Sequence, residues 1–560
     1  MKKAQLKRIM VMGVFIIFVF GVFPSSEAAK PYKLEKFKIV DTPDLIFRCL
    51  VDWPYAVYQK EENGILGGDI FCRNIVTGEE WMVPLPSGDK ILTDLKNGYI
   101  IYDVDNGSDT DVWGYKISTK TSFPIFTGSG SQEYGFIFRE RYVIPLTNES
   151  ATGDENVVVY DLNTGTYINA AVTAADEKFC HLYGDWVVYQ YDTSPSSNAD
   201  IYAYNLQTGD TVTVADGPNN EYVQGLHELI PTFLMFDAFY IPGITSSRYL
   251  VYEDDPTDDL YLYDFSDGST ELISSTAVDP EFLTMNDRFV VWIDYRNPAT
   301  PDIYGYSIAD GTEFPVCTAV NTQTSPWLTG DLVFWDDNRA DPDGTPGNWS
   351  DGGADAWEIY GKHLPNGKEF KVTDAIDPCL FRIPVAGYYT EEDVLYLWGD
   401  RRNAYTYGYT PPDFPMGGIY IGDVYFYDFK AGKEYAVSED KDTLKFNIKM
   451  IDTVFGTLVY WIEGNETDTD IYGAWKPRKE EQLNPVADFW PVAHYHLKEV
   501  NDLLSEIQNK LPDSVPEDIQ NLLDEAQTHI DNANKTGNPI YANNELLKAL
   551  ELLNEVLNKL

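Results

Sequence analysis

The sequence predicts an all-β fold, a single closed β-propeller of about eight or nine (seven to nine) four-stranded blades followed by a small C-terminal α-helical bundle. Three observations predict this class. One strand–turn–strand unit recurs nine times along the chain. Within the unit, side chains alternate with the period of two that is typical of β-strands. Near residue 495 the apolar period changes to that of an α-helix.

The clearest unit lies at residues 290–316, VVWIDYRNPATPDIYGYSIADGTEFPV. In its second strand, Tyr304, Tyr306 and Ile308 share one face, and the residues between them point to the other. Gly311 then supplies the positive φ that a tight hairpin turn requires. We therefore expect each unit to form a hairpin that packs between two layers.

The second strand of this unit recurs at 40–47 residues between most neighbouring copies, and an apolar first strand precedes each copy. A single hairpin cannot bury its own apolar face, so an array at this period indicates stacked units. About 40–45 residues is also the size of a four-stranded propeller blade. The nine copies begin at Asp69, Asp111, Asn156, Asp200, Asp259, Asp302, Glu358, Asp423 and Asp470.

Two segments, WIDYRN from Trp292 and WGDRRN from Trp398, show the repeat best: an apolar strand ends at an acidic residue, and an Arg-Asn loop follows. This pattern resembles the TolB-like β-propeller repeat family over roughly residues 33–490. The first three units lack the Arg-Asn loop, and the second has Thr119-Lys120 where the pattern has Gly. The resemblance implies a secreted or cell-surface propeller and leaves the function open, because function lies in loops grafted on the fold.

The two ends of the array resemble parts of one blade. Residues Lys36–Val40 resemble the fourth-strand segment Glu369–Thr373, and Asp488–Ala493 resembles the strand that begins a blade at Ser325–Thr329. We therefore expect the ends to share a blade and to close the ring. Closure removes exposed sheet edges, which otherwise promote aggregation.

Residues 1–28 have the pattern of a secretory signal peptide, because four basic residues precede the apolar run Ile9–Phe23. That run is short for a membrane span; an uncleaved N-terminal anchor is the alternative. The propeller would then occupy residues 29–495 and the helical module residues 496–560. No other segment is long and apolar enough to span a membrane. We expect a secreted, extracellular or cell-surface associated protein with no transmembrane segment after signal cleavage.

The formal net charge of −48 makes the protein strongly acidic. Repulsion by phosphate groups argues against nucleic acid and anionic membranes as partners. A solvated acidic surface is the simplest explanation, and a calcium-rich exterior or basic partners are also consistent with the charge. Five Cys are too few for a disulfide scaffold. Cys49 and Cys72 fall in one predicted blade and are candidates for a pair.

The last part of the chain predicts three amphipathic helices of about 15–20 residues. Apolar positions at helical spacing begin at Leu497, a capping box at Ser514 and Glu517 opens the second helix, and the third runs from about Ile540 to Leu560. Such a bundle is either a docking module, which predicts an oligomer through the C-terminal helices, or a self-contained appendage.

The candidate metal site is the acidic loop that contains Asp103, Asp105, Asp109 and Asp111 around Gly107. Oxygen ligands at alternate positions around a Gly turn suit a structural Ca²⁺ ion, although the loop lacks the terminal Glu of an EF-hand. The sequence indicates no other cofactor. A second acidic loop contains Asp336, Asp337, Asp341 and Asp343. In both loops the alternative is that Asp residues form turns and pair with Arg.

Nearby charged pairs in the repeat favour structural roles. Asp294 with Arg296, and Asp400 with Arg401, are predicted to be repeat-specific salt bridges. Among the six His only two form a close pair, and no Gly-rich phosphate loop or nucleophile elbow is present. The sequence therefore assigns no catalytic or cofactor-binding residue. The six His are His181, His227, His363, His494, His496 and His529.

Two classes of function remain. The first is a binding or scaffold module for protein or glycan partners at the cell surface, which would use the rim, the long loops 217–247, 340–357 and 401–422, or the helical tail. The alternative is a carbohydrate-active enzyme, because oligogalacturonate lyases use a related propeller with His and a divalent metal. None of the His and metal ligands of those lyases can be matched residue by residue to this chain, and the charged residues fall at repeat positions, so the sequence favours a protein that is not an enzyme.

Overall fold

The computed structural model describes residues 32–477 and 500–559 with internal gaps, of which the longest are 224–245, 340–357 and 401–422. The predicted signal peptide and the segment Asp488–Ala493 lie outside the described residues. Two of the three predicted long loops coincide with the long gaps, and the third does so for most of its length.

Nine sheets follow one another along the described chain, and each contains an antiparallel meander of strands that are consecutive in sequence; two of the sheets gain a further strand from the start of the array. We call them sheets 1 to 9 in chain order. Sheet 1 contains β3 (Ile46–Asp52), β4 (Tyr55–Lys60), β5 (Ile70–Asn74) and β6 (Glu80–Met82); sheet 2 contains β7 (Asp89–Lys96), β8 (Tyr99–Asp105), β9 (Thr110–Lys116) and β10 (Thr121–Phe126); sheet 3 contains β11 (Gln132–Phe138), β12 (Tyr142–Asn148), β13 (Val157–Asp161) and β14 (Thr166–Ala171). A short 3₁₀ turn, Ile117–Thr119, links β9 to β10.

The middle sheets repeat the same four-strand meander. Sheet 4 contains β15 (Asp176–Tyr183), β16 (Trp186–Asp192), β17 (Asp200–Asn205) and β18 (Thr211–Ala215); sheet 5 contains β19 (Asn220–Val223), β20 (Tyr249–Asp255), β21 (Asp259–Asp264) and β22 (Ser269–Ser274); sheet 6 contains β23 (Glu281–Met285), β24 (Phe289–Asp294), β25 (Asp302–Ser307) and β26 (Thr312–Cys317). Second strands such as β24 are buried at every position, whereas fourth strands such as β26 begin exposed. Buried second strands explain the continuous apolar runs in the sequence.

The last three sheets include strands from both ends of the array. Sheet 7 contains β27 (Gln323–Thr329), β28 (Leu332–Asp337), β29 (Glu358–His363) and β30 (Glu369–Lys371); sheet 8 contains β31 (Ile383–Tyr389), β32 (Val394–Asp400), β33 (Asp423–Asp428) and β34 (Lys433–Ser438), with β1 (Tyr32–Lys33) added in parallel; sheet 9 contains β35 (Leu444–Thr453), β36 (Gly456–Gly464), β37 (Thr469–Pro477) and β2 (Lys36–Val40).

The outer strand of sheet 9 comes from the start of the array. β2 pairs antiparallel with β37, with Phe37 opposite Gly473. Ile39 and Val40 of β2 are buried in one apolar cluster with Leu458 and Ile471 of sheet 9. The prediction that residues 36–40 form a fourth strand in a blade shared by the two ends is confirmed.

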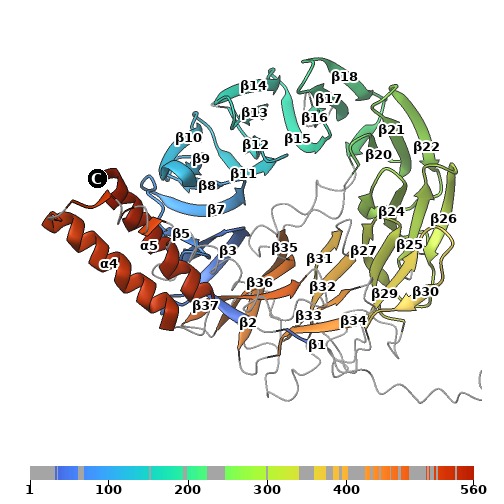
Figure 1. Cartoon of the computed structure of the whole chain (residues 1–560). Helices are drawn as coiled ribbons and strands as arrows, with labels where there is room; N and C mark the ends of the chain where they lie inside the picture. The colour runs from blue at the N-terminus through green and yellow to red at the C-terminus, as the bar shows by residue number, and fades with distance from the viewer. Residues whose placement is uncertain are drawn as a thin grey trace, which may run out of the picture.

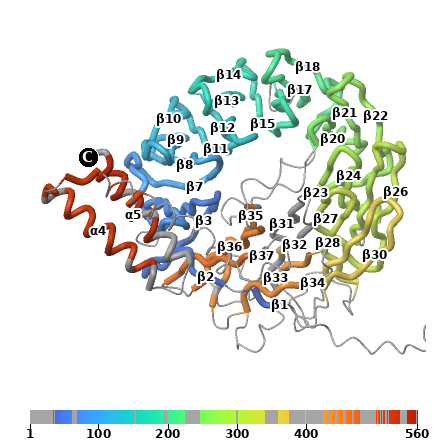
Figure 2. The backbone as a smooth tube through the Cα atoms, in the orientation of Figure 1, coloured from blue at the N-terminus to red at the C-terminus, as the bar shows by residue number. Residues whose placement is uncertain are grey.

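The sheets are arranged as in a β-propeller. Figures 1 and 2 show them around a common centre, with first strands such as β7, β15 and β35 innermost and fourth strands such as β10, β18 and β26 outermost. Each sheet packs against the next one in sequence, and β3 of sheet 1 also contacts β35, β36 and β37 of sheet 9. The apolar clusters of the core lie between neighbouring sheets, as the alternating pattern predicts.

An acidic residue and a cation link strands within sheet 6. Asp294 is fully buried, and Arg296 forms an ion pair with it at 2.7 Å and with Glu313 of the fourth strand at 2.8 Å. The guanidinium carbon of Arg296 lies 3.6 Å from the ring centre of Tyr304. The predicted salt bridge between Asp294 and Arg296 is therefore present; Arg401 of the second predicted pair lies outside the described residues.

The described Cys are buried and form no disulfide, so the suggested pairing of Cys49 with Cys72 is wrong. Cys49 lies opposite Tyr58 on β4, whereas Cys72 lies opposite Val57. Adjacent residues of a strand point to opposite faces, so the two thiols belong to different inter-sheet clusters.

The described part of the C-terminal segment is helical. α4 spans Glu517–Lys535 and α5 spans Pro539–Lys559, and they lie on the outer side of the array in Figure 1. Five described positions between residues 500 and 510 are also helical. Val500, Ile530 and Leu553 are buried in one cluster that contains helical-segment residues alone, so the apolar stripes face one another. None of the described helices is both long and apolar enough to cross a membrane.

Candidate binding site

One end of the array is formed by the turns between the first and second strands of the sheets, and we call it the turn face. These turns are tied to one another across sheet boundaries. Asn97 Nδ2 donates to the carbonyl oxygen of Glu140 at 3.2 Å, and Asn286 Nδ2 donates to that of Gly330 at 2.6 Å. Arg139 donates to the carbonyl oxygen of Gly184 at 2.8 Å. Each bond joins turns of successive sheets, so the turn face is a cross-linked surface.

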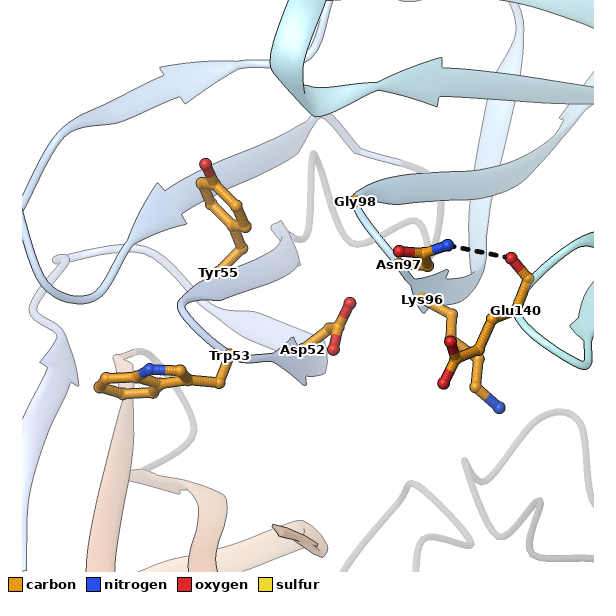
Figure 3. Close-up of a pocket in the computed structure, with 7 residues that line it drawn as sticks. All are labelled: Asp52, Trp53, Tyr55, Lys96, Asn97, Gly98 and Glu140. Carbon is orange, nitrogen blue, oxygen red and sulfur yellow. Dashed lines mark hydrogen bonds between the residues drawn. The ribbon is translucent and has the colours of Figure 1, made fainter. Parts of the chain in front are cut away.

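An open cavity of about 300 Å³ lies on this face between the turns of sheets 1, 2 and 3. Figure 3 shows its side chains: sheet 1 supplies two aromatic rings and one carboxylate, sheet 2 supplies a Lys and an Asn-Gly turn, and sheet 3 supplies a second carboxylate. The lining residues are Asp52, Trp53, Tyr55, Lys96, Asn97, Gly98 and Glu140.

Local turn chemistry places these residues. Asn97 and Gly98 have φ of 51° and 74°, as a two-residue hairpin turn requires, and Asn and Gly are the residues that adopt this conformation at least cost. Trp53 packs edge-on against Trp475 of sheet 9, with ring centres 5.1 Å apart. Tyr55 packs edge-on against Trp81 at 6.4 Å. The rings are therefore fixed in position before any ligand arrives.

Asp52 is the most perturbed group of the pocket. Burial raises the pKa of its carboxyl group, and the charge of Glu140 raises it further, whereas hydrogen bonds from the backbone of Gly98 and Asn97 and the charge of Lys96 lower it. The Lys96 and Glu140 side chains are exposed. Within the described chain no ion pair joins Lys96 to either carboxylate, so the pocket presents charges that are only weakly neutralised.

The predicted calcium ligands do not come together. In the pairing of β8 with β9, Asp103 lies opposite Val112 and Asp105 opposite Thr110, whereas Asp111 lies opposite Val104. Directly opposed residues share a face, so Asp111 points to the other face of sheet 2 from Asp103 and Asp105. Among the described residues no group of three His, Cys, Asp or Glu is placed to hold a metal ion.

Three of these four residues, Asp103, Asp105 and Asp109, accept structural hydrogen bonds instead. Asp103 is 2% exposed and its Oδ2 accepts from the backbone N–H of Tyr134 in sheet 3 at 2.7 Å. Burial raises the pKa of Asp103 to about 7. Asp105 accepts from the N–H of Gly107 at 2.7 Å, and Asp109 accepts from the side chains of Ser108 and Asn106, which is the turn-forming role that the sequence left open.

The second acidic loop follows the same pattern. Asp337 is fully buried and binds the side chains of Trp335 and Arg339, at 2.9 Å and 2.5 Å. Asp341 and Asp343 lie outside the described residues. Asp337 of sheet 7 therefore has the same role as Asp294 of sheet 6.

His181, one of the six His, lies in the inner strand β15. Its ring packs edge-on against Tyr183 at 4.9 Å, its Nδ1 has no hydrogen-bond partner, and burial lowers its pKa to about 4. No described His, Cys or acidic cluster surrounds it as metal ligands would. His227, His494 and His496 lie outside the described residues.

Sequence reasoning missed the pocket on the turn face. Asn97-Gly98 and Trp53-Pro54 are visible as turn signals in the sequence. These turns meet Glu140 in the fold only because turns about 43 residues apart lie side by side in neighbouring sheets. An approximate blade count does not predict which side chains meet there.

No protein-family model and no curated protein matches the sequence. Three solved structures illustrate the similar chains. The β-propeller domain of the trilobed protease from Pyrococcus furiosus is 12% identical over 60% of this chain and 99% of its own, with a TM-score of 0.32. Dipeptidyl peptidase 4 from Porphyromonas gingivalis is 11% identical over 76% of this chain and 65% of its own, with a TM-score of 0.45. Oligogalacturonate lyase from Vibrio parahaemolyticus is 12% identical over 80% of this chain and 99% of its own, with a TM-score of 0.34. None of these similarities assigns an activity to this chain.

Proposed function

We propose that the protein is a secreted or cell-surface β-propeller of the TolB-like kind that acts as a binding or scaffold module for protein or glycan partners. The observation that carries the proposal is the open pocket on the turn face, where consecutive turns present carboxylate, amide, ammonium and aromatic groups. Turns and loops carried by a rigid repeat array are where such folds place their binding surfaces.

The acidic residues of the repeat support a binding role rather than catalysis, because they already form structural hydrogen bonds and ion pairs. The acidic residues that end the second strands are bound by Trp and Arg, as at Asp294 and Asp337. General acid or base catalysis needs converging groups with tuned pKa values near a reacting atom. Two perturbed acids of the array, Asp94 and Asp103, instead accept hydrogen bonds from the backbone N–H groups of Ile137 and Tyr134 in the next sheet.

We further infer that the nine sheets form a single closed ring. Thr469 of sheet 9 supports closure, because its Oγ1 accepts from the N–H of Ile46 in sheet 1 at 2.6 Å and donates to the carbonyl oxygen of that residue at 3.0 Å. Tyr460 adds a third link by accepting from the N–H of Val51 at 3.2 Å. A closed ring would fix the turn face as one continuous surface.

The C-terminal helices are proposed to be a separate module that could join copies of the chain. In the described helices, the apolar side chains of this module pack against one another, which favours a self-contained bundle. An oligomer formed through these helices would therefore use their polar surfaces. Light scattering of the chain with and without residues 496–560 decides the point. A loss of higher mass on truncation supports oligomerisation through the helices.

The test of function is binding by residues 29–560 to an array of glycans and a panel of purified surface proteins, in parallel with a turnover assay. Saturable binding without turnover is the expected result. Steady product release from acidic polysaccharide in the presence of Mn²⁺ or Ca²⁺, abolished in His181→Ala, would overturn the binding module in favour of the lyase.

A further inference from the structure

The pocket of the turn face holds two carboxylates and one ammonium group. In Figure 3 the carboxylates of Asp52 and Glu140 point toward the same gap, whereas the Lys96 side chain extends away from Asp52. The two acids come from different sheets, and the charge of Glu140 raises the pKa of Asp52. A cation placed between them would relieve both this repulsion and the cost of burying Asp52.

The same fold already shows how such a cation is held. The guanidinium of Arg296 lies between Asp294 and Glu313, at 2.7 Å and 2.8 Å, and over the ring of Tyr304. Arg339 repeats this arrangement with Asp337, Glu369 and the ring of Tyr360. Two carboxylates and an aromatic ring therefore form a recurring guanidinium site inside this protein.

The pocket offers the paired carboxylates of this arrangement without a guanidinium of its own. Asp52 and Glu140 supply the carboxylates; Trp53 and Tyr55 also line the cavity, and in Figure 3 their rings point away from the gap between the two carboxylates. We propose that this pocket binds an Arg side chain of a basic polypeptide partner; the proposal rests on the binding role proposed above. Planar guanidinium matches paired carboxylates and stacks on aromatic rings better than a compact ammonium group does.

The chemistry of the site separates this ligand from a metal ion. Two carboxylates without a third acidic, His or Cys ligand fall short of a metal-ion site, and no cluster of three such residues exists among the described residues. The formal charge of −48 attracts basic segments over a distance, and the pocket would then supply the local contact.

The experiment measures fluorescence anisotropy of residues 29–560 with a labelled Gly-Ser peptide that contains several Arg, at physiological salt. The same peptide with neutral citrulline in place of Arg is the ligand control. We expect Asp52→Asn and Glu140→Gln each to weaken binding about tenfold, and Lys96→Ala to tighten it a few fold by removing a competing charge.

The matched control variant is Asp89→Asn, which removes one carboxylate from the start of β7, the strand whose other end carries Lys96. This residue is exposed, and no hydrogen bond or ion pair of its side chain is seen in the described structure. We expect its affinity to equal that of the unmodified protein. Equal weakening by Asp89→Asn and Asp52→Asn, or equal binding of the citrulline peptide, would overturn the Arg site and indicate attraction by overall charge alone.

The result also separates this inference from the proposed function. A glycan or protein from the binding panel whose affinity is unchanged in Asp52→Asn and Glu140→Gln rejects the Arg pocket and leaves the binding module intact. Absence of any saturable partner on the panel rejects the binding module itself. Thermal melting of each variant checks folding, and Glu140→Gln, an exposed position, keeps the test valid if Asp52→Asn is unstable.

Discussion

The indole Nε1 of Trp292 donates a hydrogen bond of 2.9 Å to Oδ2 of Asp294, two residues later on the same buried strand. The relationship recurs at Trp335 with Asp337, at 2.9 Å, and at Trp461 with Glu463, at 2.7 Å. In sheet 9 the cation that faces the acid is Lys36 of β2. Residues two apart on a strand share a face, so the Trp-x-acid spacing is what makes this bond available.

The first prediction follows from this triad. Asp294→Ala leaves the Trp292 indole and the partly buried Arg296 guanidinium without their partner, and we expect a loss of about 3 kcal/mol in the free energy of unfolding. The measurement is the urea midpoint with tryptophan fluorescence. Asp89→Ala, at an exposed strand start, is the control and should shift the midpoint little. Equal shifts in both variants would show that the triad adds nothing specific.

The triad and the shared blade could be predicted because both are local or repetitive. The pairing of Asp294 with Arg296 needs only the period of a strand, and residues 36–40 match a fourth strand by comparison with other copies. By contrast, the sequence alone does not place the thiols of Cys49 and Cys72 on opposite faces, because that depends on the register of β4 with both of its neighbours.

The candidate sites are harder to predict from the sequence because they depend on contacts between sheets. The sequence shows Asp103 as one of several loop acids, yet in the fold it accepts from Tyr134, 31 residues later in the next sheet. Gln59 and Gln190 make comparable bonds, to the carbonyl oxygens of Lys90 and Glu221, also 31 residues later. A constant spacing of this kind identifies a bond between sheets only when the alignment of neighbouring sheets is known.

A second prediction concerns Glu221, which is 2% exposed and whose pKa burial raises to about 7, with further increases from Asp200 and Asp254. Its folded-state pKa lies above its unfolded value, so the folded protein holds a proton that the unfolded chain releases. Stability should therefore fall as pH rises from about 4.5 to 7 and should level off above that range.

Glu221→Gln removes this dependence with little change of shape. Gln132 already fills the corresponding position, where its Oε1 accepts from the N–H of Gly128 four residues earlier. We expect the variant to be more stable than the unmodified protein by about 1–3 kcal/mol at pH 8 and equal to it at pH 5. Urea midpoints at the two pH values measure this. A variant that is destabilised at pH 8 would show that the charged carboxylate has a favourable partner.

A third prediction separates two roles for Asp103. If Asp103 is only a buried link to Tyr134, its carboxyl group should behave like that of Glu221, because burial raises the pKa of Asp103 to about 7. Asp103→Asn should then raise the melting temperature at pH 8 more than at pH 5. If Asp103 is instead a calcium ligand, added CaCl₂ should stabilise the unmodified protein and should not stabilise Asp103→Asn. Melting curves with CaCl₂ and with EDTA at both pH values measure the two effects in one series.

The last prediction concerns β2, the strand that joins the start of the array to sheet 9. Deleting residues 29–41 exposes the edge of β37, removes the buried side chains of Ile39 and Val40, and takes Lys36 away from Glu463, which is 3% exposed. Burial of two aliphatic side chains alone is worth about 1.5–3 kcal/mol each. An open strand edge also pairs readily with other chains.

The control deletes residues 29–33 only, which removes β1, a two-residue strand at the edge of sheet 8, and leaves β2 in place. We expect the shorter deletion to keep the urea midpoint and the elution profile of the parent protein. The longer one should lower the midpoint strongly and shift the protein toward aggregates in size-exclusion chromatography with light scattering. If both deletions leave stability and mass unchanged, β2 does not hold the array together, and the links from Thr469 and Tyr460 to sheet 1 must be sufficient to keep the two ends joined.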